Sequence, residues 1–294
     1  MESKKKTPIF LHILFILIAL STILPLLLVI IVSITDEHTI QVNGYSFFPE
    51  KISFEAYRYL FLDSGTVLRA YGVSIYVTIV GTVVGLLMCA LLAYPISRRD
   101  FPAHNKLAFY VFFTMLFNGG LVPWYLVFTK ILHMKDSLWG LIIPGLLLNG
   151  FYVLIMRTFF STSIPTPIIE SAYMDGAGEF RIFFQIVLRL SSPVLATIGL
   201  FYTIGYWNDW FNSLVYLSNP KLYSLQYMLN RILLNIQFLV QNTRNNHAAE
   251  QMSAMPTETV RMAMAVVGVG PIILAYPFFQ NYFVKGLTVG AVKG

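Results

Sequence analysis

The sequence predicts an all-α, polytopic membrane protein that crosses the bilayer about six times. Of its 294 residues, 56% are hydrophobic and only 12% are charged, whereas soluble domains average roughly 45–50% apolar and about 25% charged residues. The apolar residues gather in six long runs that have no Asp, Glu, Lys or Arg in their interiors. A soluble fold has too few charges here to cover so much apolar surface, but a bilayer solvates that surface directly.

The six runs define the expected membrane spans. Each approaches or exceeds the roughly 20 residues that a helix needs to cross about 30 Å of hydrocarbon, and a helix satisfies its own backbone hydrogen bonds in lipid. Gly81 and Gly85 lie four residues apart in the second run and predict a face for close helix packing, within the chain or against a partner. The spans are expected at residues 7–35, 70–97, 107–129, 137–156, 191–208 and 262–284.

Basic residues next to these runs predict the orientation. With six spans and a cytoplasmic N-terminus, the decisive clusters Lys4–Lys6 and Arg98, Arg99 and Lys106 all fall on the inner side. Because Lys and Arg are enriched in the cytoplasmic loops of membrane proteins, both termini are expected in the cytoplasm. The pI near 9.3 therefore reflects basic residues placed beside the spans, where they set the topology, and does not indicate a nucleic-acid partner.

Several function classes lack their signatures here. An ion-coupled carrier normally needs ionisable groups at mid-membrane, and the interiors of the runs have none. No GxSxG or HExxH motif is present, Cys89 is the single cysteine, and the five histidines are scattered, so neither a catalytic nor a metal site is expected. A P-loop is also absent, so energy for any transport must come from another chain.

The loop at residues 164–193 carries the most specific pattern. Thr166 is expected to cap a helix that has Pro167 in its first position. Glu170 then falls near the helix start, where a carboxylate is favoured. The sequence therefore predicts a short helix that carries an acidic residue near its beginning.

Glycines are expected to end this helix. Gly176 and Gly178 flank Ala177 and permit a sharp turn. A second, amphipathic helix is expected at about 179–190, and Ser192 with Pro193 opens the next span. An interfacial loop without a partner explains the amphipathic helix, but not the acidic, glycine-broken turn before it. The expected apolar face consists of Ile182, Phe183, Ile186 and Leu190.

This loop resembles the EAA motif of ATP-binding-cassette importer permeases, whose pattern is Glu-Ala-Ala, three residues, Gly, nine residues, then Ile-x-Leu-Pro. The spacing matches throughout, from Glu170 through Gly176 to Ile186. Ser171 replaces the first Ala of the motif, and Arg189 replaces its Pro, which removes a backbone constraint at the end of the second helix. The runs 117–125, 207–212, 255–261 and 280–294 resemble carbohydrate-importer permeases, in particular the MalG-like branch that serves complex or oligomeric sugars.

The resemblance implies the fold of an ABC type I importer permease in the bacterial plasma membrane. The whole chain, 1–294, would form one permease domain with a core at 70–284, a coupling loop at 164–193, and cytoplasmic tails at 1–8 and 285–294, the second of them extended. The implied partners are a second, homologous permease, two ATP-binding subunits that use ATP and Mg, an extracytoplasmic solute-binding protein, and membrane lipid. This chain would itself bind no cofactor. The implied coupling residues are Glu170, Ser171, Ala172, Asp175, Gly176 and Ala177.

Amides and aromatic rings in the spans are candidates for the substrate pathway, because sugars are held by hydroxyl hydrogen bonds and by stacking on rings. For the three asparagines, hydrogen bonding between helices is an equal alternative, and Trp139 and Trp210 fit the aromatic belt at the lipid–water interface. Two other functions stay open: an importer permease for a peptide or amino acid, and a membrane scaffold that does not transport. The candidates are Asn118, Trp124, Tyr125, Asn149, Tyr152, Tyr202, Tyr206, Trp207, Asn208 and Asp209.

Overall fold

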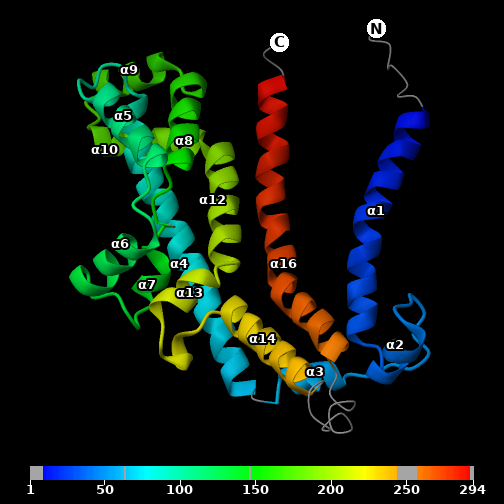
Figure 1. Ribbon diagram of the computed structural model, residues 1–294. Coiled ribbons are helices and arrows are strands. Elements are labelled where there is room, and N and C mark those ends of the chain that lie inside the picture. The colour runs from blue at the N-terminus through cyan, green and yellow to red at the C-terminus, as the bar shows by residue number, and fades with distance from the viewer. Residues whose placement is uncertain (1–8, 63, 146, 244–256, 292–294) are drawn as a thin grey trace. The chain divides into compact units, whose positions relative to one another are not determined.

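The computed structural model describes residues 9–62, 64–145, 147–243 and 257–291. The regular elements within these ranges are helices, with one isolated antiparallel bridge between Thr35 and Ile52 (Figure 1). The predicted all-α class is confirmed. The predicted tail 1–8, with the basic cluster Lys4–Lys6, lies outside the described residues.

The chain divides into two compact units, and the first combines Met1–Val67 with Leu229–Gly270. It begins with α1 (Ile9–Ser33), in which only Val32 and Ser33 are buried. The apolar surface of α1 is left for lipid or another chain. The other elements of this unit are α2 (Glu37–Asn43), α3 (Glu55–Leu60), the later part of α14 (Leu225–Thr243) and the first part of α16 (Thr257–Ala291).

A carboxylate from α2 caps the start of α16 within this unit. Glu37 accepts the backbone N–H groups of Glu258 at 3.0 Å and Thr259 at 2.9 Å. It also accepts the hydroxyls of Thr257 at 3.2 Å and Thr259 at 2.7 Å. The first N–H groups of a helix have no partner inside it, so Glu37 supplies the acceptor from a distant part of the sequence.

The second unit combines Leu68–Met228 with Pro271–Gly294. Figure 1 shows α9 and α10 at one end of its helical body and α6, α7 and α13 toward the other. Most of α4, the first turn of α14 and the part of α16 from Pro271 onward belong to this unit. Its elements are α4 (Ser64–Ser97), α5 (His104–Leu116), α6 (Leu121–Leu126), the π-helical turn η1 (Val127–Ile131), α7 (Trp139–Ile142), α8 (Gly150–Ser163), α9 (Thr166–Met174), α10 (Glu179–Ile182), the π-helical turn η2 (Phe183–Val187), α11 (Leu188–Leu190), α12 (Ser192–Trp207), α13 (Phe211–Tyr216) and the 3-10 turn η3 (Pro220–Leu222).

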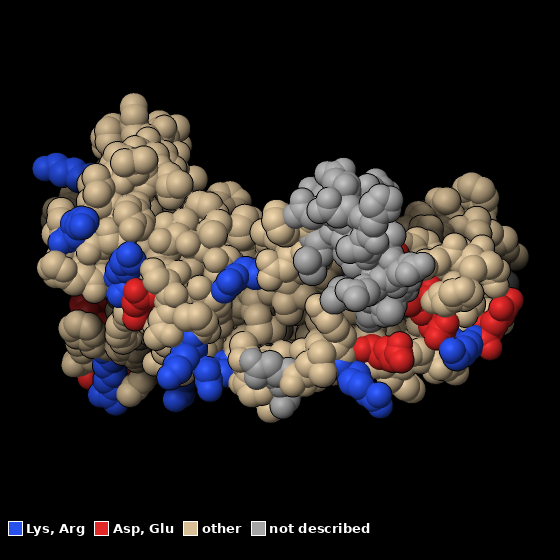
Figure 2. Space-filling view, turned by 60° about the horizontal axis from the view of Figure 1, so that its bottom comes forward, with Lys and Arg blue, Asp and Glu red and all other residues tan. Residues whose placement is uncertain are grey.

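The predicted count of six spans is not established. Among the described residues, three helices are long and apolar enough to cross a membrane, namely Ile9–Ser33, Gly65–Ser97 and Thr257–Ala275. Two bent pairs raise the number to five if each is one span. Much of the face in Figure 2 is uncharged, as expected from a chain with 12% charged residues.

Glycines break the third and fourth predicted spans. The third consists of His104–Leu116 and Leu121–Ile131, which meet at 115°, with Gly120 at a φ of 82° between them. The fourth is divided into α7 and α8, and Gly145 has a φ of 74° in the gap. Because L side chains rarely adopt such φ values, glycine permits both breaks.

The predicted small-residue face packs inside this chain. A Cβ at Gly81 would lie 2.5 Å from the ring of Tyr206, and one at Gly85 would lie 3.0 Å from the ring of Tyr202. Helices α4 and α12 therefore pack closely where these glycines of α4 face the tyrosine rings of α12. Cys89 is fully buried in the same core.

The predicted extended tail at 285–294 is wrong over most of its length. Helix α16 continues to Ala291, and residues 292–294 lie outside the described part. Glycine disfavours a helix interior by only about 1 kcal/mol, so Gly286 and Gly290 do not end this helix.

Candidate functional site

The predicted coupling loop begins with α9, but its cap differs from the prediction. Thr166 is the first helical residue, Pro165 is the N-cap, and no side chain makes a capping hydrogen bond. Pro167 lies in the first turn, as predicted. Pro165 holds the backbone extended directly before the helix, so α9 begins without a capping hydrogen bond from the Thr166 hydroxyl.

The turn after α9 is fixed by local hydrogen bonds. The N–H of Gly176 donates to the carbonyl of Tyr173 at 2.9 Å, and the N–H of Ala177 donates to that of Ala172 at 2.9 Å. This pair of bonds is the Schellman motif, which requires a left-handed residue after the helix. Gly176 has a φ of 76°, which confirms the predicted break there. Gly178 is the extended N-cap of α10, with a φ of −75°.

The second helix of the loop covers the predicted range, 179–190, but changes its pitch. Elements α10, η2 and α11 follow one another through it. Ile182, Phe183 and Val187 are buried, whereas Leu190 is 46% exposed and leaves the predicted apolar face. The π-helical turn inserts an extra residue, which shifts the positions of later residues around the helix.

An elbow joins this helix to α12. Glu179–Leu190 and Ser192–Trp207 meet at 82°. The N–H of buried Ser191 donates to the carbonyls of Val187 at 3.0 Å and Leu188 at 3.3 Å. The chain therefore bends at Ser191, two residues after Arg189, the position where the motif has proline.

The predicted coupling residues divide into exposed and buried sets. Ala172 is 8% exposed and belongs to the core of this chain, and Ala177 packs partly against the same core. Their side chains support the turn from inside. The exposed members are Glu170, Ser171, Asp175 and Gly176.

Two apolar residues of the turn were missed by the sequence argument. Met174 is 89% exposed and Phe180 is 76% exposed, on either side of Gly176. Neither side chain lies on the apolar face of its helix. A large apolar residue outside that face is the sequence signal that could have identified both. They give an otherwise polar turn two large apolar side chains for contact with another surface.

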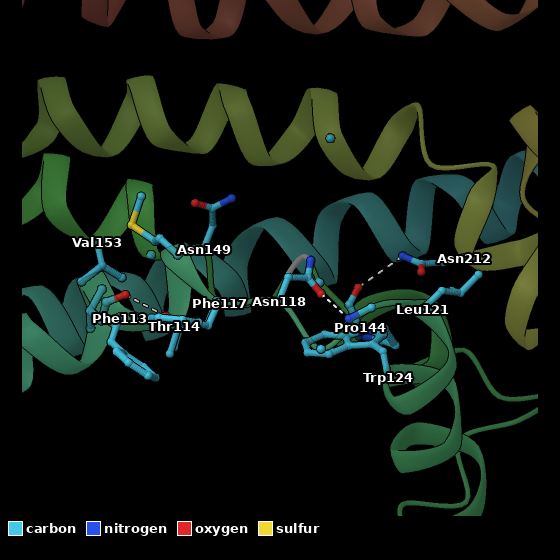
Figure 3. Close-up of a pocket in the computed structure, with 18 of the residues that line it drawn as sticks. Phe113, Thr114, Phe117, Asn118, Leu121, Trp124, Pro144, Asn149, Val153 and Asn212 are labelled. Atoms are coloured by element: carbon cyan, nitrogen blue, oxygen red, sulfur yellow. Dashed lines mark hydrogen bonds between the residues drawn. The ribbon is translucent and has the colours of Figure 1, made fainter.

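A groove of about 1320 Å³ lies between the broken helices of the second unit (Figure 3). Figure 3 shows Asn118, Trp124, Pro144 and Asn212 together at one end, and Phe113 with Val153 nearer the other. The breaks at Gly120 and Gly145 both line it. The groove therefore exists because the third and fourth predicted spans are interrupted.

Half of the predicted pathway residues line this groove. Tyr202 and Tyr206 do not, because they are buried against α4 and their hydroxyls donate to the carbonyls of Leu147 at 3.4 Å and Ile142 at 2.9 Å. Trp207 is 4% exposed. The other two outside the lining are Tyr125, stacked on Tyr216, and Tyr152, packed on Tyr202. The predicted residues that line the groove are Asn118, Trp124, Asn149, Asn208 and Asp209.

The groove amides are partly held by the backbone. The side-chain oxygen of Asn118 accepts the N–H of Gly120 at 2.8 Å, and that of Asn149 accepts the N–H of Phe151 at 2.9 Å. Both caps use the carbonyl oxygen, which leaves the amide NH2 as the group that can donate to a hydroxyl. These two amides are thereby held in fixed positions along the groove.

Asn212 is a groove residue that the sequence argument did not select. Its amide donates to the carboxylate of Asp209 at 2.7 Å and to the carbonyl of Pro144 at 3.3 Å. Its backbone N–H also donates to Asp209 at 3.0 Å. The three-residue spacing of Asp209 and Asn212 is the spacing of an N-cap and was the signal available. Among the described lining residues, Asp209 is the only Asp, Glu, Lys, Arg or His.

Comparison with known proteins agrees with the fold. Residues 105–289 match the family model described as the binding-protein-dependent transport system inner membrane component. The chain belongs to this family. It is therefore a multi-pass membrane component of a transport system, not itself an enzyme, and it works with a binding protein.

The permease is similar to two proteins of one bacterium over nearly its whole length. It is 38% identical over 273 residues to Protein LplC of Bacillus subtilis (strain 168), a match that covers 93% of this chain and 90% of that one. It is 38% identical over 281 residues to the polygalacturonan/rhamnogalacturonan transport system permease protein YtcP of the same organism, covering 95% of each.

A solved structure shares its architecture. The permease superposes with a TM-score of 0.79 and 28% identity on a chain from the crystal structure of a bacterial ABC transporter involved in the import of the acidic polysaccharide alginate. The match covers 96% of the permease and 99% of that chain. The predicted ABC importer permease fold is confirmed.

Proposed function

We propose that the permease forms half of the pore of an ATP-binding-cassette importer for a sugar or oligosaccharide delivered by an extracytoplasmic binding protein. The exposed turn around Gly176 is the observation that carries this proposal, because it presents the residues of the EAA spacing on the surface around a left-handed glycine. The sugar assignment is supported by relatives named for arabinooligosaccharide and polygalacturonan/rhamnogalacturonan transport. A peptide or amino-acid importer has no such support.

The proposed complex contains this chain, as a single permease domain, a second homologous permease, and two ATP-binding subunits that use ATP and Mg. Both termini of the permease lie in the cytoplasm, which places the loop 164–193 beside the ATP-binding subunits. Supporting this, Arg157, Arg181 and Arg189 lie in or next to the loop, as the enrichment of basic residues on the cytoplasmic side requires.

The turn docks in a cleft of an ATP-binding subunit. Glu170 and Asp175 make charged contacts there, and Met174 with Phe180 fills apolar parts of the cleft. Closure of the two ATP-binding subunits moves the turn. Since the loop joins α12 through the elbow at Ser191, α12 moves with it and changes the side from which the groove is open.

The groove supplies the chemistry for a sugar. Asn118, Asn149 and Asn208 offer amide groups to hydroxyls, and the half-exposed ring of Trp124 offers a stacking face. When a sugar enters the groove, its hydrogen bonds to water are replaced by hydrogen bonds to side chains that the backbone already holds in position. The groove is a passage with few fixed charges, which suits a polyhydroxylated substrate that must also leave.

Reconstitution with charge-reversal variants tests this function. The permease is co-expressed with its second permease and ATP-binding subunit, and ATP-driven uptake of an oligosaccharide is measured in proteoliposomes with the binding protein. Glu170→Lys should lose co-purification of the ATP-binding subunit and reduce uptake at least about tenfold, a loss of about 1.4 kcal/mol. Glu50→Lys makes the same change at an exposed glutamate outside the loop and should leave both unchanged.

Three outcomes would oppose the proposal in whole or in part. Uptake by Glu170→Lys equal to that of Glu50→Lys would remove the docking role of the turn. A permease that never associates with an ATP-binding subunit would favour the scaffold alternative. Uptake of peptides but not oligosaccharides would keep the importer and change its substrate.

A further inference from the structure

A cluster of polar side chains connects the end of α4 to both sides of the coupling turn. Arg98 follows directly after α4, and its side chain is only 14% exposed. Its guanidinium donates to the hydroxyls of Tyr94 at 2.9 Å and Tyr173 at 3.1 Å, and lies 3.7 Å from the carboxylate of Glu179. An ion pair with Asp100 holds the other edge of the guanidinium.

Glu179 completes the cluster from the far side of the turn. Its carboxylate accepts the hydroxyl of Tyr94 at 2.8 Å and also that of Tyr173. Tyr173 lies before Gly176 and Glu179 lies after it, so both arms of the turn are bonded to the last part of α4. The guanidinium carbon also lies 5.7 Å from the ring centroid of Tyr94 and 5.4 Å from that of Tyr173.

We propose that Arg98 is a positioning residue that transmits movement of the coupling turn to α4. This inference rests on the proposed function and assigns a role to a residue outside the EAA spacing. Apolar contacts also join the helix after the turn to α4. For example, the ring centroids of Phe183 and Tyr94 lie 5.4 Å apart. Apolar burial is non-directional, however, and permits sliding. The charge-assisted bonds of Arg98 fix distance and angle together.

The exposure of the cluster separates this role from simple stabilisation. Although Arg98 is largely buried, Glu179 is 57% exposed and Asp100 is 66% exposed, so water solvates both carboxylates when the guanidinium is removed and neither is left as a buried, unpaired charge. Loss of Arg98 should therefore leave the fold and the docked complex intact. What it removes is the fixed geometry between two elements that move during transport.

The number of ATP molecules hydrolysed per oligosaccharide imported tests the inference. This ratio is measured for the complete complex in proteoliposomes, with thermal stability followed in parallel. Arg98→Gln should raise the ratio by about fivefold, the lower end of typical coupling effects, with little change in melting temperature. Arg99→Gln removes the same charge from the neighbouring exposed residue and should match the wild type.

A second variant guards against misfolding of the first. Tyr173→Phe removes a single oxygen and two hydrogen bonds, so it should shift the ratio in the same direction by a smaller factor. Equal ratios in Arg98→Gln and Arg99→Gln would overturn the inference, as would an unchanged ratio in Tyr173→Phe if Arg98→Gln fails to assemble. A wild-type complex that couples no ATP hydrolysis to uptake would instead reject the proposed function itself.

Discussion

The coupling turn and the groove are built in opposite ways. The turn is made of consecutive residues, and its defining bonds join Ala172 to Ala177 and Tyr173 to Gly176. The groove is lined by residues from Leu92 to Tyr216, which come from six helices and the breaks between them. A local structure of this kind depends on single backbone conformations, whereas an assembled one depends on how distant helices pack.

This difference predicts how each region responds to substitution. A change in the turn acts through the φ of one residue and should affect coupling more than stability. A change in the groove wall acts through packing and should affect stability and uptake together. The first two predictions that follow test this contrast, and the third examines a helix cap in the first unit, in order of decreasing effect.

Substitution of Gly176 should give the largest effect. No atom lies within 4 Å of a Cβ built there, so only the φ of 76° opposes a side chain. Gly176→Val should cost about 1–3 kcal/mol in the turn and lower uptake at least about tenfold. Gly176→Asn should retain most of the uptake, because Asn tolerates left-handed backbone. Uptake is compared at equal levels of assembled complex, and equal uptake by the two variants would contradict a conformational role for Gly176.

Packing behind the groove should respond through stability. Tyr206 is 2% exposed and its hydroxyl is bonded to the carbonyl of Ile142, so its ring has little freedom to move away from a Cβ at Gly81. Gly81→Ala should destabilise the permease by about 1–3 kcal/mol. Gly72→Ala lies in the same helix with open space around it and should be neutral or stabilise by up to about 1 kcal/mol. Thermal unfolding in detergent measures both, and identical melting temperatures would remove the claim of tight packing.

The cap on α16 should give the smallest effect, and one that depends on pH. Burial raises the pKa of Glu37, but hydrogen bonds from Thr259, Glu258 and Thr257 outweigh it and leave the pKa below its usual value. A carboxyl whose pKa is lowered in the folded state stabilises the fold at a pH above the usual glutamate pKa of about 4.3. This stabilisation is lost as the pH falls through the lowered pKa of the folded state. Glu37→Gln should therefore cost about 1 kcal/mol at neutral pH.

The pH dependence of that loss provides the check. The difference in melting temperature between Glu37→Gln and the wild type should shrink as the pH falls below about 4. Glu50→Gln, at an exposed glutamate of the same unit, is the matched control and should show no difference at neutral pH. A difference that stays constant down to pH 3 would contradict the assignment of the loss to the ionised carboxylate of Glu37.

The sequence predicted what depends on neighbouring residues. The helices at Ser64–Ser97 and Ser192–Trp207 contain the second and fifth predicted spans almost completely, and the break falls at Gly176 as expected. Apolar runs specify helices in lipid, and glycine specifies the turn. The predicted Thr166 cap and the predicted face at Leu190 failed because a preceding proline and a π-helical turn changed the local geometry.

What depends on distant residues was not predictable. Tyr202 and Asn208 look equally suited to a pore in the sequence, yet one is buried against Gly85 and the other lines the groove. The contact between Tyr94 and Glu179 joins residues 85 positions apart. No periodicity or spacing encodes such a pair, because it arises only when α4 and α10 pack together.

The elbow at Ser191 has a mechanical consequence. Helix α12 contains 16 residues, and at 1.5 Å per residue it is about 24 Å long. If it turns as a rigid rod about Ser191, a rotation of about 5° displaces its far end, next to Asn208, by about 2 Å. A shift of that size is comparable to the length of a hydrogen bond, so a small tilt at the loop is enough to make or break the contacts that Asn208 offers in the groove.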